Sequence, residues 1–136
     1  MKRFRRSKIN PSPQKPLTKF SAIDGLMITD GENYWFIKNG RRMKCYSQRS
    51  FESWGIPAIL VTSNAARSLK LSGTLGFRDG SLIKDVGNGK IYLVSGGKTR
   101  HITSPDLLKI YGAKIVEVSS AEINIHTTGE EISDIL

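Results

Sequence analysis

Few residues of this chain have types and spacings that could support chemistry. The single cysteine, Cys45, lies between Lys44 and Tyr46, so its basic neighbour is expected to lower the pKa of the thiol slightly. No histidine stands near it in the sequence to act as a base. The two histidines, His101 and His126, have no carboxylate or second ligand at the spacing of a zinc site. The sequence therefore predicts no catalytic residue, no metal site and no cofactor, and it indicates a protein that is not an enzyme.

A basic and aromatic stretch around the dipeptide Asn39-Gly40 is a candidate binding face. Cations that neutralise phosphates, combined with aromatic rings that stack on bases, are what single-stranded nucleic acid requires of a protein. The second interpretation is that alternating charges protect an edge strand from aggregation. The candidate residues of this face, toward nucleic acid or toward a partner protein, are Tyr34, Trp35, Arg41, Arg42 and Lys44.

The segment from Tyr34 to Ile37 is apolar at consecutive positions, which is typical of a strand with both faces covered. We expect its own repeat to pack on one face, and the other repeat or a partner chain to cover the second. This expectation competes with an exposed platform on which bases would stack.

The elements that must position these residues occur in two copies. The segment 34–55, YWFIKNGRRMKCYSQRSFESWG, is echoed 57 positions later by 91–112, IYLVSGGKTRHITSPDLLKIYG. Each copy has an apolar run, a two-residue turn (Asn39-Gly40 or Gly96-Gly97), a basic run, and a serine (Ser47 or Ser104) suited to cap a short helix. A unit of this length buries little apolar surface alone, so the two copies are expected to pack on each other.

The remaining elements follow the same plan in both copies. Ser119 followed by Glu122 predicts a capping box at the start of the last helix. Ser63 is also expected to cap a further short helix that ends near Gly73. The final segment, Thr127–Leu136, is expected to be either a short docking strand or a frayed end. Strands are expected at 26–29, 34–38, 41–46, 59–62, 82–84, 91–95 and 98–103, and further short helices at 48–54, 105–111 and 121–126.

Charge is distributed unevenly along the chain, whose net charge is +9. Residues 1–23 contain seven basic residues and no acid, whereas residues 77–136 contain seven basic and eight acidic residues. Prolines at 11, 13 and 16 favour extended backbone in this N-terminal arm. Its apolar side chains suit an extended peptide that inserts anchors into pockets of a neighbour. The candidate partner-binding residues of the arm are Lys2, Arg3, Phe4, Arg5, Arg6, Lys8, Ile9, Leu17 and Phe20.

The second copy carries a resemblance to a known repeat. Asp79-Gly80-Ser81-Leu82-Ile83, then residues 91–102, Ser104-Pro105 and Tyr111-Gly112, together resemble a short tandem repeat of bacteriophage virion proteins and of non-catalytic modules of bacterial surface proteins. The first copy departs from this pattern, because Gln48 replaces the proline. The resemblance implies a binding or assembly module without catalysis. It further implies that the chain is a structural protein of a phage.

These observations predict an α+β fold of two tandem small repeats, each a β-hairpin with short helices and mostly antiparallel strands, preceded by an extended N-terminal arm. The expected domains are the arm (1–23), repeat one (24–76), repeat two (77–132) and a tail (133–136). The predicted function is a non-enzymatic structural or assembly protein, in a phage a head, connector or tail component, that docks on neighbouring subunits through the arm. The alternative is a nucleic-acid-binding protein that uses the arm and the Arg41–Lys44 hairpin.

The expected partners are other protein subunits, with nucleic acid as the alternative. No membrane partner and no small-molecule substrate is expected, because no apolar run is long enough to span a bilayer and no substrate-binding motif is present. The expected location is the virion for a phage protein made in the host cytoplasm, and otherwise the cytoplasm.

Overall fold

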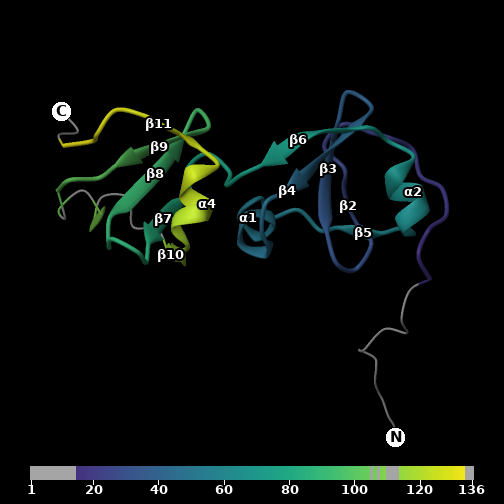
Figure 1. The fold of residues 1–136 in the computed structure, drawn as a ribbon, viewed down its shortest axis with the longest axis horizontal. Coiled ribbons are helices and arrows are strands. Elements are labelled where there is room, and N and C mark those ends of the chain that lie inside the picture. The colour runs from purple at the N-terminus through teal and green to yellow at the C-terminus, as the bar shows by residue number, and fades with distance from the viewer. Residues whose placement is uncertain (1–14, 105, 107, 110–113, 134–136) are drawn as a thin grey trace, which may run out of the picture.

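The computed structural model describes residues 15–104, 106, 108–109 and 114–133. In these ranges the fold is α+β, with two five-stranded sheets and three short helices (Figure 1). We refer to residues 15–75 as the first half and residues 77–133 as the second half. Figure 1 shows the halves side by side along the long axis, with helix α1 of the first half beside helix α4 of the second.

The first half forms one sheet with the strand order β5-β2-β3-β4-β6. The central strands β2, β3 and β4 are antiparallel, whereas the outer strands β5 and β6 run parallel to their neighbours. The elements are β2 (Met27–Thr29), β3 (Tyr34–Lys38), β4 (Arg41–Cys45), α1 (Gln48–Ser53), β5 (Ile59–Leu60), α2 (Ser63–Arg67) and β6 (Leu71–Leu75).

The second half has the strand order β10-β7-β8-β9-β11, again with an antiparallel centre and parallel outer strands. Of the predicted helix 105–111, residues 106, 108 and 109 are helical, and the other positions lie outside the described residues. The elements are β7 (Leu82–Asp85), β8 (Ile91–Ser95), β9 (Lys98–His101), β10 (Ile115–Val118), α4 (Ser120–Asn124) and β11 (Thr127–Thr128).

The prediction of mostly antiparallel strands is wrong, because parallel and antiparallel strand pairs are equally frequent. The hairpin turns dictate the antiparallel pairs locally. Each outer strand returns to the sheet after a helix, and a chain that crosses over through a helix can enter parallel to its neighbour. The turn residues in the sequence indicate the hairpin connections, but they do not indicate the crossover connections through helices.

The predicted helix from Ser63 to near Gly73 is wrong in its second part. Helix α2 ends at Arg67, and β6 follows and pairs with β4. The predicted cap at Ser63 is also wrong, because the Thr62 side chain caps the helix and Ser63 is its first residue. Gly73 has φ +133 and lies at a register shift between these two strands, where a side chain would be strained. Pairing with a strand some thirty residues upstream overrides the local helical pattern.

Strand pairing also determines the structure of part of the final segment, 127–136. β11 is parallel to β9, and Ile132 forms a further parallel bridge to Ile102. Residues 127–132 therefore belong to the edge of the second sheet, whereas residues 134–136 lie outside the described residues.

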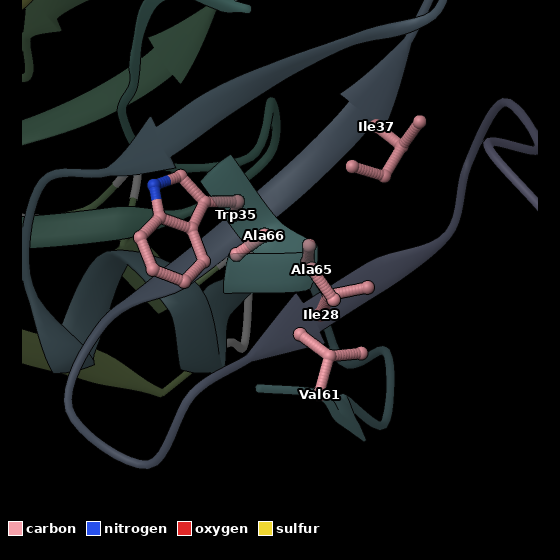
Figure 2. Packing of buried hydrophobic residues seen from close by; sticks show 6 residues of the cluster. All are labelled: Ile28, Trp35, Ile37, Val61, Ala65 and Ala66. Carbon is pink, nitrogen blue, oxygen red and sulfur yellow. The ribbon is translucent and has the colours of Figure 1, made fainter. Parts of the chain in front are cut away.

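In each half, a helix covers one face of the sheet. In the first half, α2 contributes Ala65 and Ala66 to a core with Ile28, Trp35, Ile37 and Val61 (Figure 2). In the second half, Ile123 of α4 packs with three strand residues and with Phe77, which precedes β7. That cluster is Phe77, Ile83, Val94, Val118 and Ile123. Complete burial of a side chain such as Ile37 or Ile83 contributes roughly 1.5–3 kcal/mol relative to its exposure.

In both halves an aspartate accepts a backbone N–H of the two-residue turn, from its first residue in the first half and from its second residue in the second half. The Asp24 carboxylate accepts the Asn39 backbone N–H at 2.8 Å, and the Asp79 carboxylate accepts the Gly97 N–H at 3.0 Å. Asn39 and Gly40 have φ of 54° and 71°, and Gly96 and Gly97 have φ of 61° and 76°, as the two-residue turns require. These turns are confirmed as predicted.

Candidate functional site

The hairpin of β3 and β4 divides the candidate binding residues between its two faces. Residues directly opposite each other in an antiparallel pair share a face. Lys44 is opposite Trp35 and Arg42 is opposite Ile37, whereas Arg41 is opposite Lys38 on the other face. The five residues predicted to form one binding face therefore do not lie on one surface.

Arg42 has a structural role. Its Nε donates to the Leu69 carbonyl at 2.9 Å, and its guanidinium lies 5.3 Å from the centre of the Trp35 ring. A cation over an indole face is favourable, and more so where the ring is shielded from water. Trp35 is only 6% exposed and is not accessible for stacking on a base. Arg41 and Lys44 remain exposed.

The prediction that both faces of the 34–37 strand are covered is confirmed, but the cover differs from the one expected. Tyr34 stacks on Phe51 with 3.9 Å between ring centres, and Phe36 stacks on Trp54 at 5.7 Å. Phe51 belongs to α1, and Trp54 is its C-cap residue. The second face is therefore covered by the same half, and these aromatic rings form no exposed platform for bases.

Two predicted anchors of the N-terminal arm contact the body of the protein. The Leu17 N–H donates to the Leu60 carbonyl at 3.0 Å, and the Leu17 carbonyl accepts the Thr62 N–H at 2.9 Å. Phe20 packs against the core cluster of the first half. The Leu17 side chain is 46% exposed, so part of it remains free for contact. The other predicted arm residues, Lys2, Arg3, Phe4, Arg5, Arg6, Lys8 and Ile9, lie outside the described residues.

The N-termini of α1 and α4 meet at one carboxylate, that of Glu122. Ser47 and Ser119 cap these helices, each in a capping box, which confirms both caps. The Ser47 hydroxyl donates to Glu122 Oε2 at 2.6 Å, and Arg49 donates from its terminal nitrogen to Oε1 at 2.8 Å. The Ser119 backbone N–H donates to Oε1 at 2.9 Å. Glu122 thus completes the capping box of its own helix, α4, and links that helix to α1 of the first half.

The Glu122 side chain is 4% exposed, whereas the Arg49 side chain is 50% exposed. Burial alone would raise the pKa of Glu122. Hydrogen bonds from Arg49, from the Ser119 N–H and from the hydroxyls of Ser47 and Ser119 outweigh burial and hold this pKa at about 2. Glu122 is therefore ionised at neutral pH. Its arrangement is that of a structural ion pair, since an acid catalyst needs a pKa near the working pH.

His126 joins the linker, residues 76 and 77 where the second half begins, to the second hairpin. Its Nε2 accepts the Phe77 N–H at 3.0 Å, and its Nδ1 lies 2.9 Å from the Gly97 carbonyl. These two contacts select the neutral tautomer with the proton on Nδ1. Gly76 lies so close that a Cβ there would be 2.5 Å from Nε2. Both ring nitrogens therefore serve the fold.

Cys45 is buried and lies 3.8 Å, sulfur to sulfur, from Met27. Burial raises the pKa of its thiol to about 11. The expectation that Lys44 lowers this pKa is thus wrong, because the exposed Lys44 is on the opposite face of the strand and desolvation dominates.

We expect Cys45 to resist thiol reagents while the protein is folded. At neutral pH the native protein should react at least about a hundredfold more slowly than protein unfolded in urea, since a thiol of pKa about 11 is almost never ionised. Labelling with Ellman's reagent, with and without urea, measures this ratio. Equal rates in both states would contradict the burial of the thiol.

His101 lies on the surface of β9, 3.5 Å from the Glu131 carboxylate and beside the Tyr92 ring. This is a two-residue contact. Across residues 15–104, 106, 108–109 and 114–133, no group of three or more histidine, cysteine or acidic side chains is arranged to hold a metal ion.

An open cleft of about 490 Å³ lies where α1 meets the second sheet. Its charged lining is mixed, with Arg49 and Lys114 facing Glu52 and Glu117. The acids and bases balance, so the cleft has no preference for a ligand of one charge.

The sequence indicated both helix caps but not their meeting, because Ser47 and Glu122 are 75 residues apart. Comparison of the two copies holds a signal that could have found it. Glu122 corresponds to Ala65 in the first copy, and Arg49 corresponds to Asp106 in the second. Each charge of the pair is thus present in only one copy, as expected for residues that join unlike halves.

In the described ranges, no helix is both long and apolar enough to cross a membrane. Comparisons of the chain with protein-family models, with curated proteins and with solved structures found no match.

Proposed function

We propose that this chain is a non-enzymatic assembly protein made of two tandem copies of one unit, and that it docks on neighbouring subunits through its N-terminal arm. The observation that carries the proposal is that side chains of reactive types are buried or hydrogen-bonded within the fold. Cys45 is buried, His126 bonds backbone through both ring nitrogens, and Glu122 is paired with Arg49. Binding is the role left to the exposed surface.

The tandem organisation is supported by equivalent positions 57 residues apart. Both halves have the same strand order and the same pattern of parallel and antiparallel pairs. Ile37 and Val94 are buried at corresponding places, as are Val61 and Val118. Phe20 and Phe77 also correspond, and each packs on the core of its half. On this basis the first unit includes Phe20 and begins earlier than the boundary at 24 inferred from the sequence.

The resemblance of the second copy to a repeat of phage virion proteins supports a place in a bacteriophage particle, as a head, connector or tail component made in the host cytoplasm. Fixed attachment of the arm supports the docking role. Leu17 is hydrogen-bonded at the edge of β5, so the arm is attached to the body at this residue.

Nucleic-acid binding is the second candidate function. It is favoured by the net charge of +9 and by the exposure of Lys15, Lys19, Arg41 and Lys44. It is disfavoured by the aromatic side chains of β3, which are packed on α1 or buried.

The test is deletion of residues 1–14. This deletion spares Leu17 and Phe20, whereas a deletion to residue 22 would remove contacts of the body. We expect the shortened protein to fold with unchanged stability and to be lost from purified particles. Circular dichroism measures the fold, and copurification with intact particles measures assembly.

Two full-length variants separate the contributions of charge and apolar anchors. Replacement of Phe4 and Ile9 by serine is expected to abolish incorporation, whereas replacement of the arginines and lysines at 2–8 by glutamine is expected only to weaken it. Normal incorporation of the shortened protein, together with arm-dependent binding of duplex DNA, would favour the second function. DNA binding would then show a salt slope of about −0.9 per phosphate neutralised.

A further inference from the structure

Two cations stand directly opposite each other at the tip of the first hairpin. Lys38 and Arg41 are cross-strand partners that flank Asn39-Gly40, and both are exposed. Like charges at directly opposed positions destabilise a sheet. Within the described residues neither side chain forms a salt bridge. Asp24 contacts the turn through the Asn39 backbone N–H and makes no ion pair with either cation.

The fold itself does not demand this pair of cations. The corresponding cross-strand pair of the second hairpin is Ser95 and Lys98, which carries a single charge. The second hairpin has the same two-residue turn, and an aspartate, Asp79, also accepts a backbone N–H of that turn. A repulsive pair that one copy has and the other lacks is better explained by something it binds than by the needs of the hairpin.

The two cations line an open groove of about 460 Å³. Asn39 and Ser72 add polar groups to its wall, and Met43 adds an apolar surface. Ser72 belongs to β6, the outer strand of this sheet. The groove is therefore equipped to hold a carboxylate next to a small apolar contact, since an arginine fork matches carboxylate geometry.

The edge strand β6, next to the groove, is not suited to pairing with a strand of a partner protein. The register shift at Gly73 interrupts the pairing of β6 with β4. Such a bulge twists an edge and blocks regular addition of another strand. A partner is therefore held by side-chain charge in the groove and not by an extended ladder of backbone hydrogen bonds.

We propose that the Lys38–Arg41 groove is a docking site for an acidic segment of a neighbouring protein subunit, with a carboxylate between the two cations and an apolar side chain on Met43. This inference rests on the proposed assembly function and names a second contact besides the arm. A protein segment fits better than nucleic acid for two reasons. Arg42 and Lys44 are on the opposite face of the hairpin, so the cations form no continuous track for a phosphate backbone. No aromatic ring at the groove offers a stacking surface.

The test uses full-length ¹⁵N-labelled protein titrated at low salt with a short synthetic peptide of alternating glutamate and valine. We expect saturable shift changes at Lys38–Arg41, Met43 and Ser72, and none with the glutamine counterpart of the peptide. The double variant Lys38→Glu, Arg41→Glu is expected to bind the acidic peptide at least about tenfold more weakly. The matched control is Lys90→Glu, Lys98→Glu, which changes net charge equally on the second half and is expected to bind normally.

Equal weakening by both double variants would overturn the site, because the binding would then reflect net charge. Failure of the acidic peptide to shift the groove residues would overturn it too. Tighter binding of duplex DNA or inorganic phosphate than of the peptide, lost with Lys38 and Arg41, would replace the protein segment by a phosphate ligand. Both double variants keep the arm. If the deletion of residues 1–14 abolishes incorporation while the groove binds no peptide, the docking site fails and the assembly function stands.

Discussion

Replacement of Glu122 by alanine is expected to lower the free energy of unfolding by about 2–3 kcal/mol, since it removes both a buried ion pair and a helix cap. The loss should stay below the 3–5 kcal/mol typical of orphaned buried charges, because Arg49 is half-exposed and becomes solvated. Arg49→Ala is expected to cost less, about 1 kcal/mol, since Ser47 and Ser119 still donate to the carboxylate.

Urea unfolding monitored by tryptophan fluorescence measures these differences, and the double variant gives the coupling between the two residues. Glu52→Ala is the matched control, because Glu52 is an exposed acid of α1, the helix of Arg49, and a change within about 0.5 kcal/mol is expected. An effect of Glu122→Ala no larger than that of the control would refute the stabilising contact of Glu122 with Ser47 and Arg49.

The same pair predicts the acid sensitivity of the fold. The pKa of Glu122 is lowered from 4.5 to about 2, so its ionised form stabilises the protein fully above about pH 5. This stability is lost progressively as the pH falls from about 5 to about 2, and it amounts to roughly 3 kcal/mol. Over that range, wild-type stability is expected to fall more steeply than that of Glu122→Gln. Parallel pH profiles would contradict this assignment.

Replacement of Gly76 by alanine is the second change with a large expected effect. The added Cβ would be 2.5 Å from His126 Nε2 and 2.6 Å from its Cε1, so the imidazole has to move. Its movement breaks the contacts with Phe77 and Gly97 that tie the linker to the second hairpin. We expect a loss of about 1–3 kcal/mol, measured by thermal unfolding.

Gly129→Ala is the matched control, because the atoms nearest to its Cβ would be in the stems of Arg100 and Lys98, at 3.0 and 3.2 Å. These flexible side chains can yield, so a smaller loss is expected. In a background with His126→Ala, the Gly76 substitution should cost much less, since the clashing ring is absent. Additive losses in the double variant would show that the clash with His126 is not the cause.

The sequence by itself determined the local features of this fold. The two-residue turns at Asn39-Gly40 and Gly96-Gly97 and the caps at Ser47 and Ser119 occur as predicted, because each depends on backbone angles or hydrogen bonds within a few residues. The spacing of the two similar segments also predicted two tandem units, and the two halves have equivalent strand orders.

Only the tertiary structure decided the features that depend on residues far apart in the chain. β6 is a strand because β4 offers it hydrogen bonds, and Leu17 is part of the first sheet because Leu60 and Thr62 bond to it. Cys45 has a raised pKa because its surroundings exclude water, which its charged neighbour in the sequence does not reveal. Glu122 meets Ser47 and Arg49 because packing brings the N-termini of two short helices together. Local patterns fix turns and caps, whereas packing fixes which of them become neighbours.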